Sequence, residues 1–421
     1  MNVYAIVVLA TLAVRFVVGL ITEILNLKAL RDELPEEFAG VFDAVAYKKS
    51  QDYTRAQTRF GFVTSSFNLA VTLVFWFSGG LNFLDGIVRR WSWNPILTGL
   101  TYIATLVVAR SALSLPFDIY RTFAIEERFG FNKTTAATYV ADIVKAAVLV
   151  TLLGAPLLSG IIALFQYAGA AAWSYCWLAT TLFTLFVQFI APTWIMPLFN
   201  KFVPLPEGEL RQAILSYTRS VDFPLKSLFV MDGSRRSAKA NAFFTGFGRN
   251  KRIALFDTLI EKHSVRGLVA ILAHEIGHYK KKHIIQGLAL SILQAGVLFY
   301  LLSVFIRQSG LFEAFYLGHP SIHAGLIIFV LLYAPLEMVL SVLIQIRSRH
   351  NEYEADRYAA TTTRDHDSMI QAFKLLSLHN LSNLTPHPSY VFLNYSHPPI
   401  LKRIEALRQV PSGPAATAGR S

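Results

Sequence analysis

The sequence predicts an all-α, polytopic membrane protein that carries a small soluble α+β part. Its 421 residues are 53% hydrophobic and 16% charged, whereas a soluble domain carries about 25% charged residues. The apolar residues gather in runs of about twenty, the length that a helix needs to cross roughly 30 Å of hydrocarbon. A long polar stretch in the second half of the chain contains short apolar segments bounded by Gly and Asn, which are typical of strands.

Seven apolar runs are long enough to cross the bilayer as helices. The first begins almost at Met1, without the basic n-region and the small-residue cleavage site of a signal peptide, so we expect it to be retained as a span. The predicted spans are Val3–Leu25, Gly61–Leu84, Ile96–Leu115, Ile143–Tyr167, Ala172–Met196, Ile285–Ile306 and Ala324–Val342.

The basic residues predict an orientation for these spans. If the N-terminus lies outside, the loop 26–60 faces the cytoplasm with six Lys and Arg, whereas the loop 85–95 faces outside with two. The loops 116–142 and 197–284 are also basic and also face inside, as the positive-inside rule requires. The C-terminus then lies on the cytoplasmic side. These loops account for the net charge of +12, and because no nucleic-acid-binding motif is present, we expect no nucleic-acid partner.

The spans divide the chain into five parts. Residues 1–200 hold five spans, and residues 285–345 hold the sixth and seventh. Between them, residues 201–284 contain an amphipathic helix, short strands and a second helix with a strong motif. Residues 346–410 are predicted as helix, Pro-rich loop and helix. The tail 411–421 is small and polar, and we expect it to be disordered.

The stretch "LAHEIGHYKKKH", residues 272–283, contains the pattern H-E-x-x-H on a predicted helix. His274 and His278 are four residues apart and therefore share one helix face. Zn²⁺ prefers nitrogen ligands about 2 Å away in a tetrahedral arrangement, and this spacing supplies two of them. Glu275 lies beside them, where it can take a proton from a zinc-bound water. The pattern predicts a zinc site with a general base.

A second stretch, "NEYEAD" at 351–356, can supply a further ligand. Glu352 and Asp356 are also four residues apart, so one can bind the metal while the other holds a ligand histidine. The alternative is an exposed acidic helix face. His278 precedes the sixth span by about seven residues and Glu352 follows the seventh by about ten, so both are expected about 10–15 Å beyond the bilayer core on the same side. This placement favours the metal site.

Five segments together resemble the type I CAAX prenyl endopeptidases, integral-membrane zinc proteases related to the yeast a-factor-processing enzyme. The segments are "HEIGH", "NEYEAD", "RRSAKANAFFTGFGRNKRIALFDTL", "YSHPPILKRIEAL" and "EERFGFNKTT". The resemblance covers nearly the whole chain, including the number of spans. Many zinc proteases share "HEIGH", whereas "KANAFFTGFG" and "YSHPP" are much more specific.

The resemblance implies a barrel of seven membrane helices around a large water-filled chamber, capped on the cytoplasmic side by a small zincin-type protease domain. It implies one Zn²⁺ per chain, with His274, His278 and Glu352 as ligands. Glu275 would then be the general base, and Asp356 would support a ligand from behind. The implied activity is hydrolysis of peptide bonds near the end of extended, membrane-associated or prenylated chains.

The resemblance also implies how the substrate is held. Asn241 would hold the substrate backbone in the cleft. We further predict that the substrate binds as an added strand along the edge near Asn241 and Ala242, which satisfies the peptide backbone without reading much side-chain sequence. His397, with Arg403, would steady the oxyanion. Quality control of membrane proteins, without a prenylated substrate, is an alternative within the protease class. A channel or transporter with a structural zinc would require four protein ligands, whereas the sequence offers three and a base.

The remaining expectations concern location and the other histidines. The last residues, Gly419 to Ser421, carry no ER-retention signal of the KDEL kind. This favours a bacterial homologue in the inner membrane; in a eukaryotic source we expect the endoplasmic reticulum. The protein is expected to be a monomer in the lipid bilayer. Four histidines lack ligand spacing and are predicted at the surface or in loops: His283, His319, His323 and His350.

Overall fold

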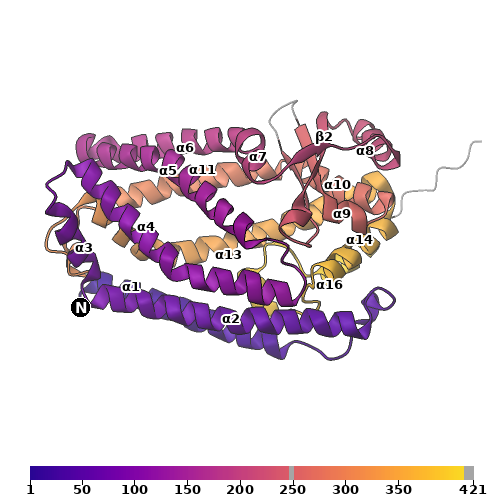
Figure 1. Cartoon of the computed structure of the whole chain (residues 1–421), viewed down its shortest axis with the longest axis horizontal. Coiled ribbons are helices and arrows are strands. Elements are labelled where there is room, and N and C mark those ends of the chain that lie inside the picture. The colour runs from indigo at the N-terminus through magenta and orange to yellow at the C-terminus, as the bar shows by residue number, and fades with distance from the viewer. Residues whose placement is uncertain (246–250, 412–421) are drawn as a thin grey trace, which may run out of the picture.

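The computed structural model describes residues 1–245 and 251–411, so residues 412–421 of the tail predicted to be disordered lie outside the described residues. Seven helices of the described chain are long and apolar enough to cross a membrane. Figure 1 shows them running along the length of the molecule, with the small sheet at one end. The predicted all-α polytopic fold with a small α+β part is confirmed. The helices are α1 (Val3–Lys28), α2 (Ala44–Phe77), α4 (Pro95–Tyr120), α5 (Ala136–Tyr167), α6 (Ala172–Ile190), α11 (His283–Phe305) and α13 (Ile322–Thr363).

These helices differ from the predicted spans mainly at their ends. Helix α2 begins at Ala44, well before its predicted start, and ends at Phe77. Gly79 follows with a φ of 72°, a left-handed conformation that glycine adopts at little cost, and the chain starts a separate helix, α3 (Gly80–Arg89). Helix α13 continues for 42 residues, past its predicted end at Val342. A run of apolar residues marks only the part of a helix that lies in hydrocarbon. The helix itself can continue into water, because its backbone hydrogen bonds do not depend on apolar side chains.

Two membrane helices continue into π-helical turns, α4 into η2 (Arg121–Glu126) and α6 into η4 (Ala191–Ile195). Along α4, no residue between Tyr102 and the end of the helix is buried. This is expected of a helix that faces lipid or an open interior instead of a packed core. The shorter helices are η1 (Glu36–Phe38), η3 (Gly169–Ala171), α7 (Met196–Phe199), η5 (Gly233–Arg235), α9 (Asp257–Lys262) and α12 (Ser309–Glu313).

The soluble part is built on a four-stranded sheet in the order β1-β2-β4-β3. Strands β2 and β4 run parallel, whereas β3 pairs antiparallel with β4 and forms one edge of the sheet. One face of β4 packs through Ile253 and Leu255 into a core shared with α8 (Glu209–Ser220) and α10 (Val265–Lys280). An edge strand offers backbone groups to a further chain. The strands are β1 (Phe202–Pro204), β2 (Leu225–Met231), β3 (Ala242–Thr245) and β4 (Lys251–Phe256).

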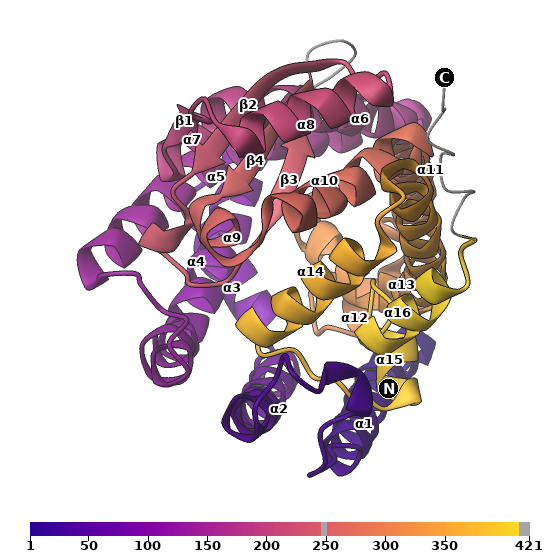
Figure 2. The same ribbon diagram turned by 90° about the vertical axis from the view of Figure 1, so that its right-hand side faces the viewer.

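Three C-terminal helices complete the soluble part: α14 (His366–His379), α15 (Pro388–Asn394) and α16 (Ile400–Arg408). They pack against α10, α13 or each other, and Figure 2 shows them in front of the membrane helices, beside the sheet. Ser264 caps the N-terminus of α10: its hydroxyl accepts a hydrogen bond from the backbone N–H of Gly267. Helices α10 and α13, which carry the predicted ligands, contact each other directly.

Candidate metal centre

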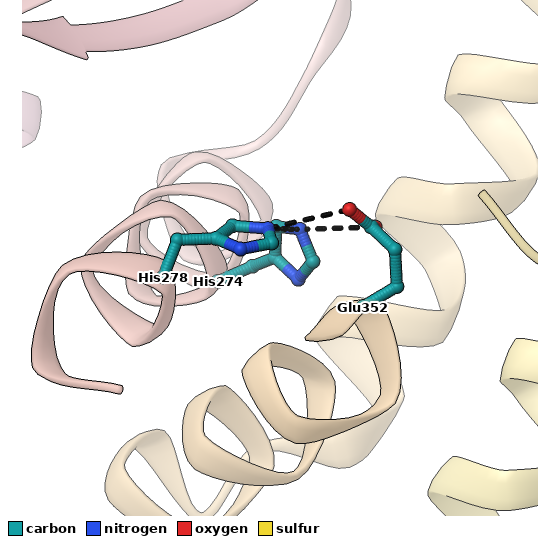
Figure 3. A group of neighbouring side chains, drawn as sticks. All are labelled: His274, His278 and Glu352. Atoms are coloured by element: carbon teal, nitrogen blue, oxygen red, sulfur yellow. Dashed lines mark hydrogen bonds and ion pairs between the residues drawn. The ribbon is translucent and has the colours of Figure 1, made fainter. Parts of the chain in front are cut away.

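Helices α10 and α13 bring the predicted ligands His274, His278 and Glu352 to one point, as Figure 3 shows. The two histidines project from successive turns of α10 because they are four residues apart. Their Nε2 atoms lie 3.2 Å from each other. Oε2 of Glu352 lies 3.4 Å from Nε2 of His274, and its Oε1 lies 3.3 Å from Nε2 of His278. The carboxylate therefore faces both imidazole rings from the neighbouring helix.

The spacing of these donor atoms fits a tetrahedral zinc ion. Ligands placed tetrahedrally about 2.0–2.1 Å from Zn²⁺ lie about 3.3 Å from one another, and the three separations here are 3.2, 3.3 and 3.4 Å. Oε2 of Glu352 is buried and takes part in no hydrogen bond with the described residues, so its lone pairs remain available to a metal. The described cluster supplies three protein ligands, whereas a closed structural zinc site has four. One of the four tetrahedral positions is therefore left for water.

Asp356 and Arg403 support His274 from behind. Nδ1 of His274 lies 2.8 Å from Oδ1 of Asp356, so Nδ1–H donates there and Nε2 keeps its lone pair. Arg403 donates hydrogen bonds of 2.6 and 2.8 Å to Asp356, and its Nη1 lies 3.3 Å from Oε2 of Glu352. Burial alone would lower the pKa of His274, but the carboxylates of Asp356 and Glu352 raise it to about 9. The two carboxylates therefore favour a positive charge at His274, which a metal ion bound at Nε2 would supply in place of a second proton.

A second chain of hydrogen bonds holds His278. Its Nδ1 lies 3.0 Å from Nδ1 of His283, and Nε2 of His283 lies 3.1 Å from Oε2 of Glu354. An ionised Glu354 can only accept a hydrogen bond, so His283 donates to it from Nε2–H. Nδ1 of His283 then accepts a hydrogen bond from Nδ1–H of His278. Nε2 of His278 is then free for a metal. Both ligand histidines thus present the same nitrogen to the centre, each fixed by a partner on its other nitrogen.

The prediction that His283 lies at the surface is wrong, because its side chain is buried. His278 and His283 are five residues apart and would point about 140° apart on one continuous helix. Lys282 interrupts the helix with a φ of 60°, between α10 and α11, and this turn brings the two rings together. His323, also predicted at the surface, is buried and lies 2.6 Å from Asp85. Neither contact follows from a regular spacing of residues along one helix, so the sequence alone could not predict it.

Glu275 and His397 lie beside the three ligands. Glu275 is half-buried on α10, and this burial raises the pKa of its carboxyl. Nε2 of His397 lies 3.2 Å from Oε1 of Glu352, while the His397 side chain remains 62% exposed. Pro398 and Pro399 separate His397 from α16, which begins at Ile400, because consecutive prolines restrict the chain to extended backbone. The turn therefore presents an accessible imidazole to the cluster, and its catalytic role stays a prediction.

The predicted substrate residues Asn241 and Ala242 lie at the start of the edge strand β3. The backbone C=O of Asn241 accepts a hydrogen bond from Phe256, and its side chain accepts one from the N–H of Ala242. Asn241 borders a cavity of about 540 Å³ that His397 and Arg403 also line. The residue that precedes the edge strand therefore borders the same cavity as two neighbours of the ligand Glu352, namely His397 and Arg403. Because Arg403 is buried and bound to Asp356, its direct contact with substrate stays a prediction.

Two protein families match the chain over adjoining ranges. Residues 23–201 match the family described as CAAX prenyl protease N-terminal, five membrane helices. Residues 204–410 match peptidase family M48. The first range holds α2, α4, α5 and α6. The second holds the soluble part, the last two membrane helices and every predicted site residue.

Individual relatives match along almost the whole chain. The chain is 34% identical to "CAAX prenyl protease 1 homolog" of Arabidopsis thaliana, over 89% of this chain and 90% of the relative. It is 32% identical to "CAAX prenyl protease 1" of Saccharomyces cerevisiae, over 91% of this chain and 90% of the relative. The crystal structure of S. mikatae Ste24p superimposes with a TM-score of 0.88 at 31% identity, and the match covers 97% of this chain and 99% of that one.

Proposed function

The chain belongs to the M48 family of type I CAAX prenyl proteases, and from this premise we propose that it is a zinc endopeptidase that cleaves near the end of extended, membrane-associated chains. It is a multi-pass membrane metalloprotease of the CAAX-processing kind. The observation that supports zinc is the tetrahedral spacing of three donor atoms from α10 and α13. A fourth position open to water supports catalysis over a structural role.

We propose one Zn²⁺ per chain, held by His274, His278 and Glu352. When bound there, zinc lowers the pKa of a water and polarises a peptide carbonyl. Glu275 takes the proton of the attacking water at its carboxylate and delivers it to the leaving amine. His397 donates a hydrogen bond to the carbonyl oxygen as negative charge develops on it, which an exposed imidazole beside the cluster can do.

The peptide is proposed to lie along β3 as a further strand. Backbone pairing at Asn241 and Ala242 holds the chain extended across the cavity shared with His397. Since this pairing reads little side-chain chemistry, broad sequence tolerance is expected. A prenyl group on the substrate would remain in the membrane. We propose that the site lies on the cytoplasmic side, and the basic loops beside it support this placement.

The test compares two peptides of one sequence that end in Cys-a-a-X, one farnesylated and one with a free thiol. Purified full-length protein in bilayer nanodiscs is stripped of metal with a chelator and reloaded with zinc. We expect cleavage only after zinc is restored, with a lower KM for the farnesylated peptide. The Glu275→Gln variant is the matched control, because its amide keeps the shape of the side chain but accepts no proton.

Two outcomes would contradict parts of this proposal. If zinc-loaded wild-type protein cleaves neither peptide, the proposed endopeptidase activity is wrong for these chain ends. If both peptides are cleaved with the same KM, the prenyl group is not recognised, and clearance of membrane proteins becomes the better description. Zinc content measured on the same samples separates loss of metal from loss of activity.

A further inference from the structure

The segment "EERFGFNKTT", residues 126–135, is not explained by the metal centre. Its first residue, Glu126, ends the π-helical turn η2, which continues α4. Oε1 of Glu126 accepts hydrogen bonds from the Tyr53 hydroxyl (2.6 Å) and the Gln57 amide (2.7 Å) of α2. Oε2 lies 3.1 Å from Nζ of Lys239, which also donates to the Tyr53 hydroxyl at 2.8 Å. Two membrane helices therefore bind one lysine of the soluble part.

Two aromatic rings, Phe131 of this segment and Tyr53 of α2, lie against this lysine. Nζ of Lys239 lies 4.5 Å from the ring centroid of Phe131 and 5.2 Å from that of Tyr53. Phe129 and Phe131 pack edge-on against Tyr53, at 5.0 and 5.1 Å between centroids. The side chains of Glu126 and Lys239 are 16% and 38% exposed. Charge-assisted hydrogen bonds and cation–π contacts are stronger in such shielded surroundings than at an open surface, so the ammonium is held in one place.

Lys239 stands two residues before Asn241, where the peptide is proposed to pair. The backbone around these two residues is hydrogen-bonded to three other segments, which keeps it rigid. The bonds run from Ala238 N–H to Phe131 C=O (3.0 Å), from Thr258 Oγ1 to Lys239 C=O (2.9 Å) and from Ala240 N–H to Asn380 Oδ1 (3.2 Å). A fixed side chain at Lys239 therefore sets the position of the edge strand that follows.

We propose that Lys239 is a positioning residue for peptide hydrolysis. By binding Glu126 and Tyr53, Lys239 holds the strand edge at Asn241 and Ala242 in place. An extended peptide that pairs with this edge is then held at the right distance from the metal centre. The inference rests on the proposed function, because it assumes that the peptide pairs with this edge. It also gives the segment 126–135 a role: a displacement of α2 or η2 is transmitted to the strand that holds the substrate.

A separate ion pair attaches the same segment to the membrane helices, so the positioning role of Lys239 can be tested apart from attachment of the soluble part. Arg236, three residues earlier, donates hydrogen bonds of 2.7 and 3.0 Å to Asp142 of α5. This pair joins the same segment to the membrane helices without Lys239. Loss of the Lys239 contacts should therefore leave the soluble part attached and the protein folded, while the edge itself gains freedom to move.

The experiment uses the full-length protein with four substitutions: Lys239→Met, Lys239→Arg, Glu126→Gln and Lys133→Met. Lys239→Met removes the charge and keeps the length of the chain, and Lys239→Arg restores the charge. Glu126→Gln keeps an oxygen for Tyr53 and Gln57 but loses the ion pair. Lys133→Met is the matched control, because Lys133 is an exposed lysine of the same segment, 126–135. For each variant, kcat, KM, zinc content and amide hydrogen exchange are measured.

For Lys239→Met we expect KM to rise about tenfold with kcat within about threefold, since a lost charge-assisted bond of this kind is worth about that factor. Zinc content should stay unchanged, and exchange should accelerate at residues 238–242 but not in α10. Glu126→Gln should shift KM in the same direction, and Lys239→Arg should restore most of the KM. Lys133→Met should behave like the wild type.

Hydrogen exchange separates this inference from the proposed function. If exchange at residues 238–242 is unchanged in Lys239→Met, Lys239 does not position the edge, whatever the protein cleaves. If exchange accelerates but KM is unchanged, the edge is held by Lys239 without serving the substrate, and the inference is again wrong. If the wild type cleaves no peptide, the proposed function fails by itself, and binding of a peptide to zinc-loaded Glu275→Gln then replaces KM as the readout.

Discussion

The metal centre and the edge strand at Asn241 and Ala242 are built in different ways, although Asn241 and two neighbours of the metal centre, His397 and Arg403, line one cavity. The metal centre comes from two helices, and each helix carries its functional side chains four residues apart. The edge at Asn241 depends on contacts between distant segments: Lys239 binds Tyr53, 186 residues away, and Ala240 binds Asn380, 140 residues away. Substitutions at the metal centre should therefore abolish zinc binding or catalysis, whereas substitutions that loosen the edge should change KM by smaller factors.

The largest effect should come from the third ligand. Glu352→Ala removes the carboxylate that faces both ligand histidines, so zinc should be lost and activity should fall below detection. Glu354, two residues away, forms ion pairs with His283 and His350 and, among the described residues, with no metal ligand, so Glu354→Ala should retain zinc under saturating metal. Elemental analysis of the two purified variants decides between them. Retention of zinc by Glu352→Ala and its loss from Glu354→Ala would reverse the assignment of the ligand.

The next effect should come from His397, which reaches the metal centre from a distant turn. Loss of one hydrogen-bond donor to an oxyanion costs about 10²–10³ in rate. We therefore expect His397→Ala to bind zinc and substrate almost normally and to lose that factor in kcat, measured by steady-state kinetics at saturating zinc. A kcat within about threefold of the wild type would leave His397 with a structural role only.

The same contrast explains what the sequence could and could not reveal. Spacing along one helix predicted the pair His274 and His278, and hydrophobic runs predicted the seven membrane helices, because both follow from helix geometry alone. The partner of His278 could not be predicted, since His283 reaches it only through the break at Lys282. The polar start of α2 was not predicted for a related reason, because it has no apolar run to mark it. A helix was predicted from residue 346, but its continuity with the seventh span in α13 was not.

A smaller effect should come from His283, which holds His278 without touching the metal site itself. Partners of this kind typically contribute about 10–100-fold to metal affinity. His283→Asn should weaken zinc binding by that factor, measured by competition with a chelator of known affinity, and should regain activity at higher zinc. His350→Asn is the matched control, because His350 is 63% exposed and lies at 4.0 Å from the same Glu354. Equal zinc affinity in the two variants would show that the hydrogen bond to His278 has no energetic role.

The smallest effect should come from Asn380, which holds the edge through the backbone of Ala240. Its amide pairs with both backbone groups of Ala240, as a neighbouring strand would, at 3.2 and 3.5 Å. In Asn380→Ala these groups face the cavity of about 540 Å³ that Asn380 now lines, so water can replace the lost bonds. The net loss is then about 0.5–1.5 kcal/mol, and KM should rise about three- to tenfold with kcat unchanged. Asn383→Ala, which lines the same cavity but binds Asn26, should leave KM at the wild-type value. An equal rise in both variants would assign the effect to the cavity wall and not to the edge.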